Sequence, residues 1–194
     1  DQSGIIPVSS SYDAESGVAQ IKLTRINDST ENATVIIGGY NKENGINTAM
    51  ESMGCASYET IEKILPYLDT YLMDIKHTNP AKHKEFTGRS NELMLENTKK
   101  IAASGLTNLV IRVPVIPGFN DRADEIESIA RFAGSLPGVN KIHLLPYHRL
   151  GQDKYEGLGR EYLMGDVLPP TNEKMETLRQ AVLRVSKLDC QIGG

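Results

Sequence analysis

The run Tyr71-Leu-Met-Asp-Ile-Lys76, which lies between two helical patterns, decides the fold class of this chain. A short apolar run of this kind is typical of a buried strand. Side chains alternate along a strand, so Leu72, Asp74 and Lys76 share one face, while tyrosine, methionine and isoleucine take the other. Two opposite charges are therefore expected on one face of a strand whose other face is apolar or aromatic.

Similar runs occur on both sides of this strand and alternate with helical patterns. The strand-like runs cover residues 46–51, 71–76, 109–116 and 141–146, and the helical patterns cover about 57–65, 90–105, 121–134 and 172–187. Alternation of this kind is the signature of βα units around a parallel sheet. The sequence from residue 46 onward therefore predicts an α/β fold with four such units.

The first 41 residues differ in composition from the rest of the chain. They are rich in Ser, Asn, Thr and Gly, and residues 1–45 hold six acidic and three basic side chains. Two strand-like runs, 18–26 and 34–37, are separated by a turn-prone stretch. We expect a weak hairpin or an arm over residues 1–41, and a separate main unit over residues 42–194.

The composition limits the function classes. The 194 residues carry a formal charge of -4, which gives no basic footprint for nucleic acid or acidic membranes. No stretch approaches the roughly 18 apolar residues of a membrane span. Two cysteines are too few for a secreted disulfide scaffold or a structural zinc site. We expect a cytoplasmic globular protein with one core and neither nucleic-acid nor membrane partners.

Every predicted unit supplies an ionisable residue at or near the carboxyl end of its strand, where parallel α/β folds place their sites. These candidates are Glu51, Asp74, Lys76, Arg112 and His148. Arg112 interrupts an apolar run, and a buried arginine requires an anionic partner. The sequence therefore predicts a charged site at this end of the sheet.

Each candidate also has a structural interpretation. Glu51 could be a solvated strand end, and Asp74 with Lys76 could be a local ion pair. We expect His143 to be structural, both thiols to be inert, and His77 and His83 to lie at the surface. The long connector over residues 149–170 is either a lid or docking surface or a plain connector.

Five motifs carry a resemblance to a known family. They are Ile46-Asn-Thr-Ala-Met-Glu-Ser-Met-Gly54, Tyr71-Leu-Met-Asp-Ile-Lys-His77, Phe86-Thr-Gly88, Ile111-Arg-Val-Pro-Val-Ile-Pro-Gly-Phe-Asn120 and Leu144-Leu-Pro-Tyr-His-Arg-Leu-Gly151. In order and spacing, over about residues 42–190, they resemble the glycyl radical enzyme activating enzymes, most nearly those of pyruvate formate-lyase. These belong to the radical S-adenosylmethionine (SAM) family, whose fold is a partial (β/α)6 barrel.

The resemblance implies that the four strands are the last four of six. It also implies the family chemistry: a [4Fe-4S] cluster reduces S-adenosylmethionine, and the deoxyadenosyl radical abstracts hydrogen from a backbone glycine of a partner enzyme. An electron donor such as flavodoxin would serve the intact enzyme.

The same resemblance assigns roles to the candidates, none of them as acid, base or metal ligand. It places Glu51 and Asp74 near the methionyl part of the cofactor and Lys76 at its carboxylate. It places His148 beside the cofactor and Arg112 facing the same cavity. A ligand with both charge signs requires partners of both signs.

The sequence departs from the family in two motifs. The cluster motif C-x3-C-x2-C is absent, because Cys55 and Cys190 are the only cysteines, and Gly38-Gly39 is not followed by Glu-Pro. We therefore expect the C-terminal part of an activating enzyme, inactive alone, with the edge at 46–51 covered by residues 18–37 or a second copy. The alternatives are a non-catalytic cofactor- or partner-binding module and a lyase that forms a Schiff base through Lys76.

Overall fold

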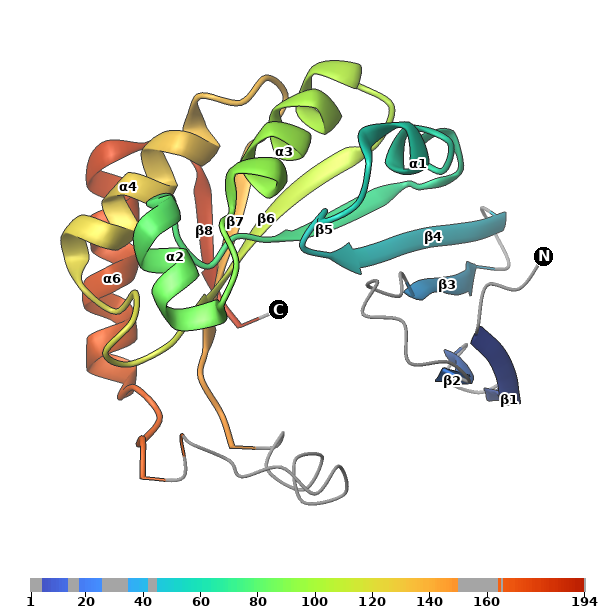
Figure 1. The fold of residues 1–194 in the computed structure, drawn as a ribbon, viewed down its shortest axis with the longest axis horizontal. Coiled ribbons are helices and arrows are strands. Elements are labelled where there is room, and N and C mark those ends of the chain that lie inside the picture. The colour runs from blue at the N-terminus through green and yellow to red at the C-terminus, as the bar shows by residue number, and fades with distance from the viewer. Residues whose placement is uncertain are drawn as a thin grey trace.

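A six-stranded sheet forms the centre of the molecule (Figure 1). The computed structural model describes residues 5–13, 18–25, 35–41, 45–149, 164 and 166–193. The strands are β3 (Val35–Asn41), β4 (Gly45–Ser52), β5 (Thr70–Asp74), β6 (Asn108–Val115), β7 (Lys141–Pro146) and β8 (Asp189–Ile192), in that spatial order. Strands β4 to β8 are parallel, and β3 is antiparallel to β4. The predicted α/β class with parallel strands is confirmed.

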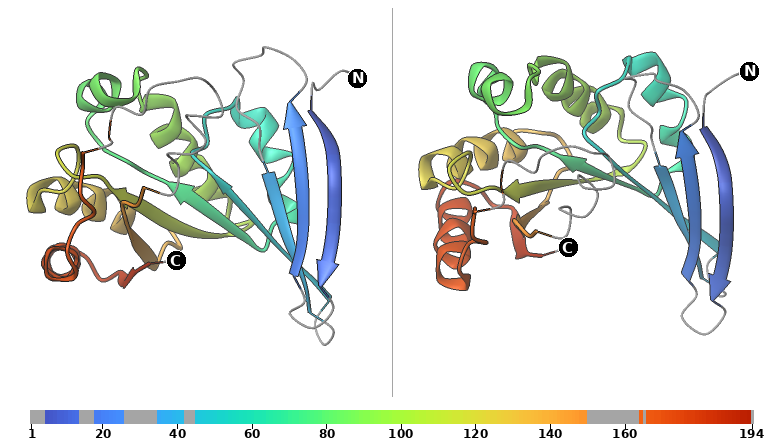
Figure 2. Two further views of the ribbon diagram at one scale, coloured as in Figure 1. Left: turned by 90° about the horizontal axis from the view of Figure 1, so that it is seen from below. Right: turned by 60° about the horizontal axis from the view of Figure 1, so that its bottom comes forward.

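The helices connect successive parallel strands and lie along one side of the sheet (Figure 2). They are α1 (Tyr58–Glu62), α2 (Pro80–Thr87), α3 (Glu92–Ser104), α4 (Ala123–Gly134) and α6 (Asn172–Val185), and a 3-10 turn (Leu65–Tyr67) follows α1. Local sequence sets their ends. The Thr171 side chain accepts the Lys174 backbone N–H at the start of α6, and Gly105 ends α3 with a left-handed φ of 62°.

The hydrophobic core lies between the sheet and these helices. Tyr71 and Met73 on β5 and Ile75 just after it are buried in this core, as the alternation predicts. On the opposite face of β5, Leu72, Asp74 and Lys76 are half-buried. Among the described elements no helix covers that face (Figure 2). The fold is therefore a curved sheet with an apolar outer face under the helices and a polar inner face.

The structure contains elements that were not predicted, among them β8 and α2. Strand β8 has four residues, too short for a periodic pattern. Helix α2 has the sequence Pro-Ala-Lys-His-Lys-Glu-Phe-Thr, which presents no apolar stripe, and it begins because Asn79 caps it and Pro80 occupies its first turn.

The prediction that His77 and His83 lie at the surface is wrong, because they are 5% and 3% exposed. His83 Nδ1 lies 2.7 Å from the Arg89 carbonyl oxygen, and the His77 ring centroid lies 5.6 Å from that of Phe119. Both rings are held by polar and aromatic contacts made by the loops that surround α2. The partners of these rings lie in loops, so the helical periodicity of the sequence does not predict the contacts.

An N-terminal hairpin is present, with a pairing different from the one expected. Strands β1 (Ile5–Asp13) and β2 (Val18–Arg25) form a separate antiparallel sheet that lies beside β3 (Figure 2). The run predicted at 34–37 instead belongs to β3, which pairs with β4 and covers the edge that the sequence left open. The boundary near residue 41 stays a prediction.

Two further points concern long segments. None of the described helices has the length and apolar character needed to span a bilayer. Most of the connector over residues 149–170 lies outside the described residues, so its interpretation as a lid or docking surface stays a prediction.

Candidate functional site

An ion-paired cluster occupies the inner face of the sheet near the carboxyl ends of β4, β5 and β6. Arg112 Nη1 lies 2.6 Å from Glu51 Oε2, and Arg112 Nε lies 3.4 Å from Asp74 Oδ1. The side chains of Arg112 and Asp74 are 16% and 18% exposed, whereas that of Glu51 is 50% exposed. Three of the five candidates are therefore in contact, and Arg112 has the anionic partners that its position requires.

Strand register explains why these three residues meet. Asp74 is the register partner of Arg112, and Glu51 is the register partner of Leu72, two residues earlier on the same face. Adjacent strands are about 4.8 Å apart, so the long Arg112 side chain on β6 reaches Asp74 on the neighbouring β5 and Glu51 on β4, one strand further. The parallel sheet thus brings together residues that are far apart in the chain.

Lys76 follows β5 by two residues and acts on the same cluster electrostatically. Burial raises the pKa of Asp74, the positive charges of Lys76 and Arg112 oppose this rise, and the Glu51 carboxylate adds to it. Burial outweighs the two cations, so the ionised form of Asp74 is costly in this setting. A cationic ligand group beside Asp74 would relieve that cost.

The remaining candidate, His148, lies just beyond β7 and is exposed. His143, which the sequence analysis predicts to be structural, is the register partner of Arg112 on β7, and its role stays a prediction. Alternation along β7 could have identified it, since His143 points away from the buried Ile142 and Leu144. Burial, followed by the charges of nearby cations, lowers its pKa, so His143 is neutral at pH 7.

Three polar atoms of this inner face are buried without a hydrogen-bond partner. They are Asp74 Oδ1, Arg112 Nε and His143 Nε2, on three adjacent strands and in one register row. Asp74 Oδ1 and Arg112 Nε face each other in the ion pair at 3.4 Å, and a polar ligand or water would supply the hydrogen bonds that all three atoms lack. A carboxylate, a guanidinium and a neutral imidazole in one row fit a polar ligand that carries both charge signs, as S-adenosylmethionine does.

The thiols do not form a comparable set. Within the described ranges, no group of three or more His, Cys, Asp or Glu side chains is arranged to hold a metal ion. The sequence has two cysteines, Cys55 in the loop after β4 and Cys190 on β8. A [4Fe-4S] cluster held by three thiolates therefore does not fit the residues of this chain.

The two thiols are expected to differ in reactivity. Cys190 is 6% exposed, and burial raises the pKa of its thiol to about 11, whereas Cys55 is half-buried. Only thiolates alkylate readily. A short iodoacetamide pulse at pH 8 should modify Cys55 alone, and both thiols should react in urea, as counted by intact mass. Modification of Cys190 in the folded chain would show that β8 is not stably packed.

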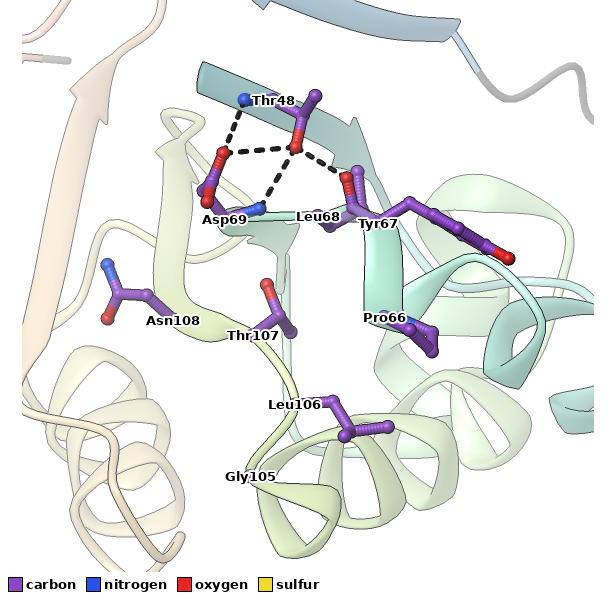
Figure 3. Close-up of a pocket in the computed structure, with 9 residues that line it drawn as sticks. All are labelled: Thr48, Pro66, Tyr67, Leu68, Asp69, Gly105, Leu106, Thr107 and Asn108. Carbon is purple, nitrogen blue, oxygen red and sulfur yellow. Dashed lines mark hydrogen bonds between the residues drawn. The ribbon is translucent and has the colours of Figure 1, made fainter. Parts of the chain in front are cut away.

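A hollow with a volume of about 520 Å³ lies at the amino ends of β5 and β6, beside Thr48 in the middle of β4 (Figure 3). The Asp69 carboxylate accepts the backbone N–H of Thr48 at 2.7 Å and its hydroxyl at 3.2 Å, and the same hydroxyl accepts the Asp69 N–H at 3.1 Å. These bonds tie the turn before β5 to β4. The hollow is thus at the opposite end of the strands from the charged cluster.

Comparison with known proteins gives a consistent result. The family model for the radical SAM superfamily matches residues 12–133. The indoleacetate decarboxylase activating enzyme of Tractidigestivibacter scatoligenes is 38% identical over 142 residues, which cover 72% of this chain and 44% of that protein. The 4-hydroxyphenylacetate decarboxylase activating enzyme of Clostridioides difficile strain CD196 is 41% identical over 152 residues, covering 78% and 48%.

Among solved structures, a domain of the pyruvate-formate lyase-activating enzyme from Bacteroides vulgatus superposes with a TM-score of 0.62 at 27% identity. The superposition covers 78% of this chain and 84% of that one. The aligned part of the chain spans about half the length of the curated relatives, between 44% and 48% for the two named above.

Proposed function

This chain belongs to the radical SAM superfamily, and from that membership we propose that it supplies the cofactor-binding face of a glycyl radical enzyme activating enzyme. The observation that carries the proposal is the cluster of Arg112, Glu51 and Asp74 on the helix-free face. Relatives whose names describe activating enzymes of this kind support the reaction class.

The residues of the cluster have complementary roles in this proposal. Lys76 and Arg112 bind the carboxylate of S-adenosylmethionine, while Glu51 and Asp74 face its ammonium and sulfonium charges. The core beneath the sheet excludes water from one side and fixes the strands that carry these groups. His148 lies beside the cofactor at the strand ends. In a complete enzyme that also holds the electron-donating cluster, these residues would hold S-adenosylmethionine, which would supply the deoxyadenosyl group that takes a hydrogen atom from a glycine of the partner.

The partner and the electron source belong to the whole protein in this proposal. The named relatives activate decarboxylases and, in Desulfovibrio desulfuricans, an isethionate sulfite-lyase, so we propose a glycyl radical enzyme as partner without choosing pyruvate formate-lyase among them. A donor such as flavodoxin would act in the cytoplasm on a complete enzyme. Because three cluster thiolates do not fit this chain, we propose that it binds cofactor but is inactive alone.

Ligand binding tests this proposal directly. We expect the chain to bind S-adenosylmethionine about tenfold or more tightly than 5′-methylthioadenosine, which lacks the charged amino-acid end, in calorimetric titration. Arg112→Gln should remove this preference, because a charge-assisted contact to the carboxylate is lost. Arg184→Gln, which breaks an ion pair to Glu127 on the helical side, should leave both affinities unchanged. Equal affinity of the unsubstituted chain for both ligands would contradict the proposal.

A further inference from the structure

Three buried asparagines hold the backbone that follows the strands of the site. Asn91, Asn97 and Asn120 are 2%, 1% and 0% exposed. Each side-chain amide donates to main-chain carbonyls: Asn97 to Gly54 and Ala56, Asn91 to His77, and Asn120 to Lys76 and Pro114. The loops at the carboxyl ends of β4, β5 and β6 are thus held from the helical side of the sheet.

Asn120 differs from the other two because both ends of its amide are satisfied. Its Oδ1 accepts the Ile116 N–H at 2.7 Å, whereas Oδ1 of Asn91 and of Asn97 has no partner. The turn after β6 delivers it, with Gly118 at a left-handed φ of 79° and the Asn120 N–H donating to the Ile116 carbonyl at 3.2 Å. This side chain is therefore fixed in one orientation by the turn that carries it.

The two carbonyls that Asn120 binds are equivalent positions on neighbouring strands. Strand β5 ends at Asp74, whose register partner is Arg112, so Lys76 and Pro114 would form the next pair on the same face. Asn120 Nδ2 lies 2.7 Å from the Lys76 oxygen and 2.8 Å from the Pro114 oxygen. The amide therefore extends the β5–β6 pairing beyond the last strand residue and keeps Lys76 level with Pro114, one pair beyond Asp74 and Arg112.

We infer that Asn120 is a positioning residue that sets the place of Lys76 beside Asp74 and, through it, the affinity for the carboxylate of the ligand. The effect of Lys76 on Asp74 depends only on this chain, whereas the effect on ligand affinity rests on the proposed function. Without the amide, the Lys76 carbonyl loses its link to the Pro114 carbonyl on β6, and Lys76 moves with the loop. The Lys76 charge would then act more weakly on Asp74.

The ligand-free test is a ¹³C NMR titration of the Asp74 carboxyl, which faces Lys76, Arg112 and Glu51. Lys76 lowers the pKa of Asp74 in the unsubstituted chain, so Lys76→Gln should raise it. Asn120→Ser should raise it in the same direction, and the double variant should match Lys76→Gln alone, because the effect of Asn120 passes through Lys76. An additive double variant would overturn the inference.

Asn97→Ser is the matched control, since Asn97 is equally buried but holds the loop after β4. It should leave the Asp74 titration unchanged, and an equal shift in both variants would mean that loosened packing rather than Asn120 is responsible. Asn120→Ala also removes the donor and adds no charge near Asp74, so it should reproduce the Asn120→Ser shift even if the serine variant folds poorly. An unchanged titration in Asn120→Ala would also overturn the inference.

The ligand test separates the two proposals. Asn120→Ser and Lys76→Gln should each weaken S-adenosylmethionine binding about tenfold without changing the affinity for 5′-methylthioadenosine. A loss of both affinities would show general damage and contradict a positioning role. If the unsubstituted chain binds no S-adenosylmethionine, the proposed function fails, while the Asp74 titration still decides the role of Asn120.

Discussion

Arg112→Gln is expected to lower the free energy of unfolding at pH 7 by about 2–4 kcal/mol, measured by urea titration. The substitution leaves Asp74, with a side chain 18% exposed, without the guanidinium at 3.4 Å, and Glu51 without the one at 2.6 Å. Removing one partner of a largely buried pair costs more than the pair contributes, because the remaining charge keeps its desolvation penalty.

The loss of unfolding free energy in Arg112→Gln should depend on pH in a defined direction. Burial already raises the pKa of Asp74, and Arg112 opposes this, so the substitution raises that pKa further. A carboxyl with a raised pKa favours the folded state below its unfolded value and loses that contribution as pH rises through the folded value. The deficit of Arg112→Gln should therefore be largest at pH 7 and shrink toward pH 4.

The matched comparison is Arg184→Gln, which breaks an ion pair with Glu127 on the outer surface. An exposed pair contributes about 0–1 kcal/mol, so this variant should unfold almost like the unsubstituted chain. Equal losses at both positions would show that Arg112 stabilises the sheet through packing alone. If the loss of unfolding free energy in Arg112→Gln did not depend on pH, Asp74 would not be the carboxylate left without a partner.

Ile111→Ala should cost about 2–5 kcal/mol in unfolding free energy, since it leaves a cavity in the middle of the core. Ile111 is fully buried on β6 and faces the helices. Leu72→Ala removes a half-buried side chain from the inner face of β5 and should cost less than half as much. Urea titration of both variants measures the difference.

Comparable losses of unfolding free energy in the two variants would mean that the inner face is packed as tightly as the outer one.

The S-adenosylmethionine affinity of Ile111→Ala, measured well below its melting temperature, should remain within about threefold of the unsubstituted value. Ile111 does not face the ligand, and the backbone of β6 is held by its ladders to β5 and β7. A much larger loss would show that the core cavity displaces Arg112.

Side-chain alternation was enough to predict which residues share the site where the two faces of a strand differ clearly in polarity. It placed Asp74 and Lys76 on one face, and the arginine in an apolar run required the anionic partners that Glu51 and Asp74 provide. It would also have selected His143, had the rule been applied to β7. The positions of these residues follow from a local periodicity and the fixed spacing of parallel strands.

Features set by distant contacts were not predictable in this way. Helix α2 depends on an asparagine cap and an initial proline rather than on an apolar stripe, and β8 gains its place from pairing with β7. His77 and His83 are buried by aromatic and carbonyl partners from other loops. The pairing of β3 with β4 likewise joins neighbours in space that no alternation pattern specifies.

The division of the sheet into an apolar outer face and a polar inner face has a consequence for how such a chain can change over generations. Residues that decide whether the chain folds and residues that decide what it binds occupy opposite sides of the same strands, so their side chains pack against different surroundings. Inner-face replacements can accumulate at little cost to folding, provided that each leaves no stranded charge. The same scaffold can therefore acquire a new specificity by exchanging a few alternate positions on β4 to β8.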